Sequence, residues 1–314
     1  MTFDLSGKRI WVAGHRGMVG AAVVRRLAGE GCEILTAGRE IVDLLDQAAV
    51  RGWMQANRPD AIVLAAAKVG GIKANSEFPV DFLHQNLMIE TNILAAAHET
   101  DVARVLFLGS SCIYPKFAPQ PIPEDALLTG PLEPTNEWYA IAKIAGIKLV
   151  QAYRTQYGRD WISAMPTNLY GPGDNYDLNS SHVLPALLRK FHEAKTRGAP
   201  EVVLWGSGTP LREFLHCDDL ADALIFLLGQ YSGHEHVNVG SGVEVTIREL
   251  AEIIADVVGY RAALVFDSTK PDGTPRKLMD SGRLHRMGWN RARPLREGIA
   301  QTYADWLQQT GAKQ

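Results

Sequence analysis

Tyr139 and Lys143 are the residues of this sequence whose types and spacing could do acid–base chemistry. They lie four positions apart in the segment Glu-Trp-Tyr-Ala-Ile-Ala-Lys, so on a helix both side chains share one face. An ammonium beside a phenol favours the phenolate, and this lowers the pKa of a tyrosine from its usual value near ~10 toward neutral pH. An ordinary amphipathic helix can carry the same spacing. The pair therefore indicates chemistry only together with other motifs.

A glycine-rich turn near the start of the chain predicts a dinucleotide site. The turn separates a buried strand predicted for Arg9–Ala13 from a helix predicted for Met18–Gly29. In this setting the first glycine permits a tight turn, the second lets a pyrophosphate approach the backbone, and the third lets the helix pack on the strand. The alternative is a tight turn without a ligand. The residues assigned to the cofactor here are Gly14, His15, Arg16, Gly17, Met18, Val19 and Gly20.

The end of the second predicted strand bears on the choice between NAD and NADP. A strand over Glu33–Ala37 has no carboxylate at its tip, where NAD enzymes hold the ribose hydroxyls, and Arg39 stands there instead. Together with Arg16, Arg39 suits a 2′-phosphate, so the sequence favours NADP. The alternative is that Arg39 is a solvated loop charge. Asp43 is assigned to the adenine side of the cofactor.

Further apolar runs predict an α/β fold with a doubly wound parallel sheet. Strands are expected at 61–66, 104–109 and 161–166, alternating with helical patterns. After Gly171 the pattern becomes irregular, with shorter elements and a loop predicted over Lys270–Lys277. We therefore expect a nucleotide-binding domain of residues 1–170 plus about 215–240. A smaller substrate domain would comprise about 171–214 plus 241–314.

Composition excludes several other classes. The formal net charge of −3 gives no basic excess for nucleic acid, and no apolar run reaches the roughly 18 residues of a membrane span. The N-terminus lacks a secretory pattern. Three widely spaced cysteines suit a reducing cytoplasm, and no Cys/His cluster has zinc-ligand spacing, so no metal is expected.

These features together resemble the extended short-chain dehydrogenase/reductase superfamily. The resemblance rests on the glycine turn, Ala65-Ala66-Ala67, Asn92, Gly109-Ser110-Ser111 and the Tyr139/Lys143 pair. Longer segments narrow it to the GDP-L-fucose synthase family and span nearly the whole chain. These segments are residues 108–115, 132–137, 165–172, 179–183, 205–216 and 270–277.

The resemblance implies a two-step enzyme that acts on GDP-4-keto-6-deoxy-D-mannose. The family inverts C3 and C5 and then reduces the C4 ketone with NADPH, and its members are usually homodimers. The catalytic residues implied are Ser110, Cys112, Tyr139, Lys143 and His182. Further implied cofactor contacts are Ala66, Leu108, Gly109, Lys143, Pro166, Asn168, Leu169 and His182. The implied contacts to the GDP-sugar are Lys190, Trp205, Arg212, Asp272 and Lys277.

The resemblance also implies a role for each catalytic residue. Tyr139 and Ser110 would stabilise the oxygen at C4, and Ser110 rather than Ser111 because it precedes Tyr114 by four residues. Cys112 would remove a proton and His182 would return one from the other face of the sugar. The alternatives are a buried structural thiol and a loop histidine bonded to backbone. Trp205 could instead belong to the domain core.

Three other functions remain open from the sequence. The first is a related GDP-sugar enzyme, such as one that forms GDP-colitose from a 3-deoxy ketone. The second is a nucleotide-sugar 4-epimerase with tightly held NAD, against which Arg39 and Cys112 argue. The third is a non-catalytic NADP sensor, which would have no need of Ser110, Tyr139 and Lys143.

Overall fold

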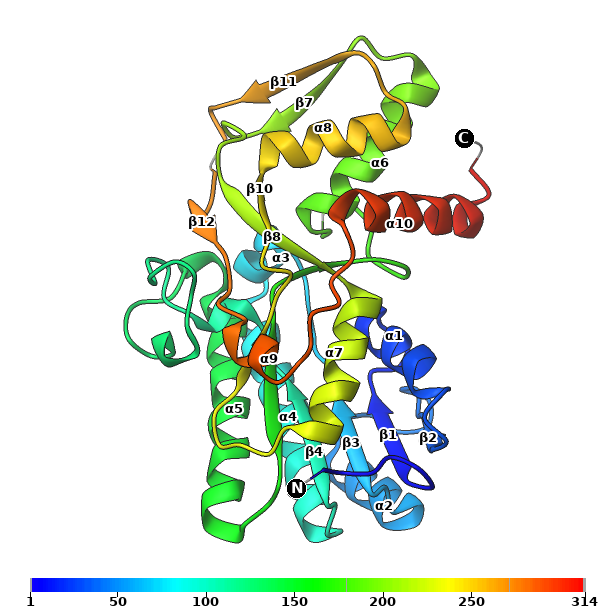
Figure 1. Cartoon of the computed structure of the whole chain (residues 1–314), viewed down its shortest axis with the longest axis vertical. Coiled ribbons are helices and arrows are strands. Elements are labelled where there is room, and N and C mark those ends of the chain that lie inside the picture. The colour runs from blue at the N-terminus through cyan, green and yellow to red at the C-terminus, as the bar shows by residue number, and fades with distance from the viewer. Residues whose placement is uncertain (1, 179, 271, 313–314) are drawn as a thin grey trace.

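A six-stranded parallel sheet forms the centre of the lower half of the molecule (Figure 1). The computed structural model describes residues 2–178, 180–270 and 272–312. The strand order is β2-β1-β3-β4-β5-β9, and the apolar runs make β1, β3, β4 and β5 buried almost throughout. The strands are β1 (Arg9–Ala13), β2 (Glu33–Leu35), β3 (Ala61–Leu64), β4 (Arg104–Leu108), β5 (Ile162–Pro166) and β9 (Val237–Val239).

Helices cover both faces of this sheet, as a doubly wound fold requires. On one face the core contains apolar side chains of α2, α4 and α5, and on the other those of α1 and α7. Short helices connect these elements. The bounds are α1 (Met18–Leu27), α2 (Gln47–Asn57), α3 (Ile72–Glu77), α4 (Pro79–Glu99), η1 (Ser111–Ile113), η2 (Glu124–Ala126), η3 (Pro134–Asn136), α5 (Glu137–Tyr157), α7 (Cys217–Gln230) and α9 (Gly282–Arg286).

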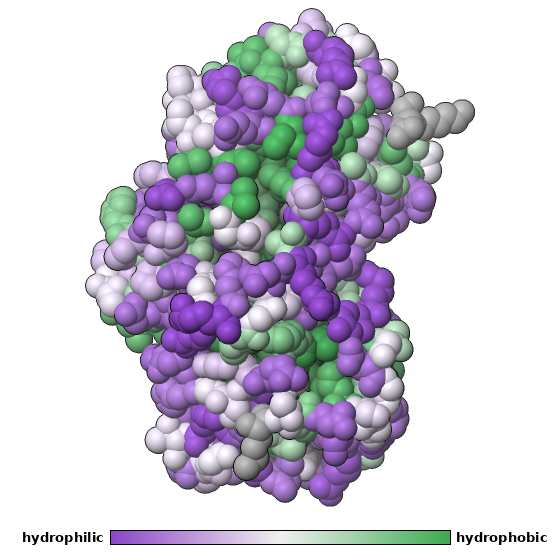
Figure 2. Space-filling model, viewed as in Figure 1, coloured by the Kyte–Doolittle hydropathy of each residue, from purple (hydrophilic) through white to green (hydrophobic). Residues whose placement is uncertain are grey.

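The upper half of the molecule has a hydrophobic core of its own, built around α6, α8 and α10 (Figure 1). Two small sheets, β10-β8-β12 with β6 beside β8, and β11-β7, complete it. Figure 2 shows hydrophobic side chains gathered on this face mainly in the upper half, amid a hydrophilic surface. The elements are β6 (Asn168–Tyr170), α6 (Val183–Arg197), β7 (Glu201–Trp205), β8 (Leu211–His216), β10 (Glu244–Thr246), α8 (Ile247–Val258), β11 (Ala263–Asp267), β12 (Arg276–Lys277) and α10 (Leu295–Thr310).

Helix ends follow local sequence chemistry. Thr246 and Glu249 form a capping box at the start of α8: the Thr246 side chain accepts from the Glu249 N–H at 3.0 Å, and Glu249 accepts from the Thr246 N–H at 2.7 Å. The Asp46 side chain caps α2 in the same manner. These caps fix where the helices begin.

The strand order places the predicted cofactor turn at the switch point of the sheet. From β1 the chain passes to β2 on one side and then crosses to β3 on the other. Open parallel sheets bind ligands in the crevice at the carboxyl ends of strands where the order reverses in this way. The glycine turn after β1, the segment after β3 and Ser110 after β4 all lie at that edge.

The predicted elements agree with the structure apart from their ends and one short segment. The predicted strand over Glu33–Ala37 ends already at Leu35. The loop predicted over Lys270–Lys277 is wrong at its end, because Arg276 and Lys277 form β12 and pair with β8. Within the described residues no helix is long and apolar enough to cross a membrane.

Candidate active site

Backbone contacts within the cofactor turn explain two of its three glycines. Gly14 has φ +91°, and a Cβ there would lie 2.7 Å from the backbone nitrogen of Ala66. A Cβ on Gly20 would overlap the carbonyl of Gly14. A Cβ on Gly17 would meet nothing nearer than 3.5 Å, so this position faces open space, as expected for a pyrophosphate neighbour. The turn therefore packs against the end of β3 and fits a dinucleotide.

The adenosine end of the predicted site contains a carboxylate that the sequence analysis missed. Glu40 Oε2 accepts from Arg16 Nη1 at 2.8 Å, and both side chains are exposed. Arg39 is exposed and takes part in none of the ion pairs found among the described residues. The Asp43 carboxylate accepts from the N–H of Leu45 at 3.1 Å. Glu40 directly follows Arg39 in the sequence, and this position was the signal from which Glu40 could have been assigned to the site.

The remaining predicted cofactor residues lie at the carboxyl edge of the sheet. Leu108 ends β4, Pro166 ends β5, and Gly109 is held so close to the Met165 side chain that it has no room for a Cβ. Asn168 and Leu169 belong to β6, and the Asn168 amide donates to the Glu213 carbonyl at 2.8 Å. That hydrogen bond orients Asn168 within the structure.

Ser110 and Cys112 are positioned by the short helix that follows β4. Ser110 caps η1, and its Oγ accepts from the Cys112 N–H at 3.4 Å. Burial raises the pKa of the Cys112 thiol, while the positive charges of Lys277 and Lys143 and the Ser110 hydrogen bond act in the opposite direction. The thiol thus lies within the electrostatic reach of the Tyr139/Lys143 helix and of β12.

The expected lowering of the Tyr139 pKa is wrong for the protein without a cofactor. Burial raises the pKa of Tyr139 well above its usual value, and the charges of Cys112 and Glu90 raise it further. The Lys143 ammonium lies 5.9 Å from the centre of the Tyr139 ring and 2.9 Å from Glu90 Oε1. Its charge is therefore shared with a carboxylate that the sequence analysis missed.

Lys277 lies close to both His182 and Cys112. His182 is the N-cap residue of α6 and is solvent-exposed, yet desolvation and the nearby charge of Lys277 lower its pKa. Lys277 acts on both His182 and Cys112, so the predicted base, the predicted acid and this cation share one electrostatic environment.

A pocket joins Cys112 to Lys277. Its other lining side chains come from the segment after η1, from the segment before α5 and from β12. Among them, Asn136 Oδ1 is buried with no hydrogen-bond partner among the described residues, and the buried Glu133 Oε2 pairs with the Lys116 ammonium at 2.9 Å; neither residue was predicted. The pocket is lined by Ser111, Cys112, Tyr114, Pro115, Lys116, Gln120, Ile122, Glu133, Asn136, Thr274, Arg276 and Lys277.

The residues predicted for the GDP moiety lie on the upper half of the molecule. Arg212 is half-buried beside Asp272, and burial lowers the pKa of Lys190 on α6. Trp205 is 66% exposed at the end of β7, which excludes the alternative that it belongs to the core. Asp272 accepts from the Ser207 N–H at 2.7 Å and from its hydroxyl at 2.9 Å. Asp272 thus also ties down the turn after Trp205.

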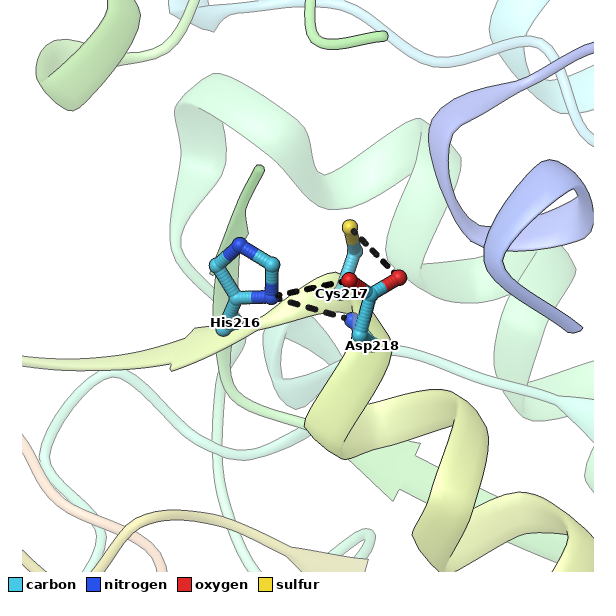
Figure 3. Close-up of side chains that lie close together, drawn as sticks. All are labelled: His216, Cys217 and Asp218. Atoms are coloured by element: carbon cyan, nitrogen blue, oxygen red, sulfur yellow. Dashed lines mark hydrogen bonds and ion pairs between the residues drawn. The ribbon is translucent and has the colours of Figure 1, made fainter. Parts of the chain in front are cut away.

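His216, Cys217 and Asp218 also lie close together, where β8 passes into α7 (Figure 3). His216 Nδ1 accepts from the Asp218 N–H at 3.2 Å and caps α7. The Asp218 carboxylate pairs with Arg25 at 2.5 Å, and the same guanidinium lies 4.0 Å from the Cys217 sulfur. Because a cation already contacts both acidic groups, we assign this cluster to the start of α7 rather than to a metal.

The parallel sheet, the glycine turn and the Tyr139/Lys143 helix define an α/β enzyme that binds a dinucleotide. The model of the NAD dependent epimerase/dehydratase family matches residues 10–240. The chain is similar to GDP-L-fucose synthase 1 of Arabidopsis thaliana, at 62% identity over 96% of this chain and 94% of the relative. It is 56% identical to the GDP-L-fucose synthase of Escherichia coli K12, over 97% and 98% of the two chains. It therefore belongs to the GDP-L-fucose synthase family, within the NAD dependent epimerase/dehydratase family.

Two further comparisons bear on cofactor and substrate. A solved structure of a GDP-L-fucose synthetase from Naegleria fowleri bound to NADP superposes with a TM-score of 0.90 and 29% identity, covering 100% of this chain and 98% of that one. The GDP-L-colitose synthase of Yersinia pseudotuberculosis is 38% identical, over 94% of this chain and 96% of the relative. Similarity to the colitose enzyme is thus weaker than to the fucose enzymes of Arabidopsis thaliana and Escherichia coli.

Proposed function

We propose that this protein converts GDP-4-keto-6-deoxy-D-mannose into GDP-L-fucose by inverting C3 and C5 and then reducing the ketone at C4, with NADPH as reductant. The geometric observation that carries the proposal is the placement of Cys112 beside Tyr139. Burial raises the pKa of Tyr139, and the charge of Cys112 raises it further, so the thiol acts on the phenol at the carboxyl edge of the sheet. Identity of 56–62% to GDP-L-fucose synthases over nearly the whole chain supports this substrate rather than the colitose precursor.

Epimerisation uses the carbonyl to acidify its neighbours. When Cys112 as thiolate removes the proton from C3 or C5, charge develops on the C4 oxygen. The hydroxyls of Tyr139 and Ser110 donate hydrogen bonds to that oxygen, each such donor typically stabilising an enolate by about 3 kcal/mol. His182, which lies close to Lys277 as Cys112 does, returns a proton to the other face of the carbon. Inversion requires a base on one face of the carbon and an acid on the other.

Reduction then takes place on the same carbonyl. NADPH, when bound, supplies hydride to C4, and the Gly14 turn and Arg39 are the residues that would hold it. As C4 receives hydride, its oxygen becomes an alkoxide and takes the proton of the Tyr139 hydroxyl. Ser110 keeps the oxygen oriented, and Lys143 balances the charge left on the phenol. One phenol thus assists both stages.

Heavy water separates the two stages experimentally. The substrate is incubated with enzyme in D₂O without NADPH, and deuterium at C3 and C5 is read by NMR; NADPH oxidation is followed separately by absorbance. The parent enzyme should incorporate deuterium at both carbons and oxidise NADPH. Absence of both signals would contradict the proposed function.

Single substitutions test the proposed roles of Cys112 and Tyr139. Cys112→Ser should abolish deuterium incorporation while slow direct reduction of the ketone continues, and Tyr139→Phe should lose most of the reduction. Cys32→Ser is the control, because Cys32 is only half-buried and lies at the start of β2, away from the cleft. Exchange in Cys112→Ser as fast as in the parent would remove the thiol from the mechanism.

We further propose that the two domains predicted from the sequence bind different ligands. Residues 1–170 with about 215–240 would bind NADP, and about 171–214 with 241–314 would bind the GDP moiety through Lys190, Trp205, Arg212, Asp272 and Lys277. The separate hydrophobic core around α6, α8 and α10 supports this division. A cytoplasmic location, which we also propose, suits three free cysteines.

A homodimer is proposed through α4 and α5. These helices are each 21 residues long and pack on one another. Val80 on α4 and Trp138 and Ile141 on α5 remain exposed, and such apolar side chains on adjacent helices suit a second copy of the chain. Light scattering should give twice the monomer mass, and Ile141→Glu should reduce it to one monomer. A monomeric parent enzyme would rule the dimer out.

A further inference from the structure

A buried ion pair joins the two long helices directly behind Tyr139. Glu90 of α4 is 1% exposed and Lys143 of α5 is 2% exposed, with Nζ 2.9 Å from Oε1. Apart from this ion pair, neither Glu90 oxygen has a hydrogen-bond partner among the described residues; burial raises the pKa of Glu90, and the charge of Lys143 opposes that rise. Lys143 is thus the group that balances this carboxylate. Buried charges are seldom kept without a partner, since desolvation of each is costly.

The surroundings make room for the carboxylate. Gly146 lies one turn after Lys143 on α5, and a Cβ there would be 2.8 Å from Glu90 Oε2 and would overlap the Phe107 ring. A glycine inside a helix is unfavourable, so its presence at this contact preserves space for Glu90. On the other side, the Lys143 ammonium lies 4.7 Å from the centre of the Phe107 ring. The ammonium is therefore confined between a carboxylate and an aromatic face.

The ion pair determines how much positive charge Tyr139 experiences. Burial raises the pKa of Tyr139 most, and the charges of Cys112 from η1 and Glu90 from α4 raise it further; the Lys143 ammonium lies 5.9 Å from the centre of the Tyr139 ring. An unpaired ammonium at this range would lower the pKa of a phenol by one to three units. With Glu90 beside it, that effect is largely cancelled, and the charge of Glu90 itself opposes formation of the phenolate.

We propose that Glu90 is a positioning residue that holds Lys143 beside Tyr139 and opposes ionisation of the Tyr139 hydroxyl. The inference rests on the proposed function, in which Tyr139 must donate a hydrogen bond to an enolate during two inversions before it gives up its proton. A phenolate at that position would repel the enolate oxygen. Glu90 thus suits an enzyme that needs a neutral phenol first and a proton donor afterwards.

The test measures the pKa of Tyr139 in the free enzyme. Tyrosine labelled with ¹³C at Cζ is titrated by NMR, and the Tyr139→Phe variant identifies the signal among the nine tyrosines. Glu90→Gln keeps the shape and removes the charge, and we expect it to lower the pKa of Tyr139 by about one unit or more. The alkaline limit of ketone reduction should move to lower pH by the same amount.

A second variant keeps the proposal testable if Glu90→Gln does not fold. Glu90→Asp retains the charge but draws it back from Lys143, so it should lower the pKa by less than Glu90→Gln while still changing it measurably. An unchanged pKa of Tyr139 in a folded Glu90→Gln would overturn the proposal and would mean that Glu90 is already uncharged. The titration needs neither substrate nor NADPH, so its outcome is independent of whether the proposed reaction occurs.

Discussion

Lys277 lies beside Cys112 in one pocket, and its ammonium lowers the pKa of the thiol while burial raises it. Replacing Lys277 with Met should therefore raise the pKa of Cys112 by about one unit and slow its alkylation by iodoacetamide roughly tenfold at a given pH. The measurement is the rate of carboxamidomethylation at Cys112, followed by mass spectrometry between pH 7 and pH 10.

Lys8→Met is the matched control for this experiment, because Lys8 precedes β1 at the opposite edge of the sheet. Its alkylation profile should equal that of the parent. Should Lys277→Met react as fast as the parent across the range, the ammonium would have no influence on the thiol. Lys277 would then serve only the phosphates of the substrate.

Arg39 and Arg16 should contribute unequally to NADPH affinity. Arg16 is already paired with Glu40, whereas Arg39 takes part in no ion pair among the described residues. We expect Arg39→Ala to weaken the binding of NADPH about 10- to 100-fold and the binding of NADH only slightly, since only NADPH carries the 2′-phosphate. Arg16→Ala should reduce the affinity for NADPH less than Arg39→Ala does. Titration calorimetry with both cofactors checks this, and equal losses of NADPH and NADH in Arg39→Ala would contradict it.

Features that depend on the type of one residue or on residues close together in the chain could be predicted from the sequence. Gly14 and Gly20 could be predicted because only glycine fits against Ala66 and the turn carbonyl. The strands β1, β3 and β4 could be predicted from unbroken apolar runs. The capping box at Thr246 and Glu249 was equally local. Each depends on neighbours close in the chain.

Contacts between distant segments escaped prediction. Glu90 and Lys143 are 53 positions apart, so nothing local revealed that the ammonium expected to act on Tyr139 was shared. The one available signal was a Glu within the apolar stretch Met88-Ile89-Glu90. β12 was likewise missed, because two residues become a strand only when β8 supplies their partners. Polar side chains without a partner, such as Asn136, are visible only once the chain is folded.

Gly14 should tolerate no side chain. Gly14→Ala would introduce strain at φ +91° and a contact of 2.7 Å with the Ala66 backbone, so we expect a loss of about 3 kcal/mol or more in unfolding free energy and weaker binding of NADPH. Urea denaturation measures the loss. Gly29→Ala is the control, because a Cβ there meets nothing within 4 Å, and it should change stability by about 0.5 kcal/mol or less. A stable Gly14→Ala would refute the assigned geometry.

Asp174, in the turn after Gly171, should make stability fall with rising pH. Its Oδ1 accepts from the Asn175 N–H at 2.7 Å, Oδ2 is buried with no hydrogen-bond partner among the described residues, and burial raises the pKa of Asp174 to about 7. The unfolded carboxyl ionises near ~4, so from there to pH 7 the unfolded state loses its proton first and is favoured. The unfolding free energy of Asp174→Asn, relative to that of the parent, should therefore increase by on the order of 2 kcal/mol from pH 4.5 to pH 8. Urea denaturation at both pH values measures this, with Glu252→Gln, exposed on α8, as control; an equal difference at both would show that Asp174 is not shifted.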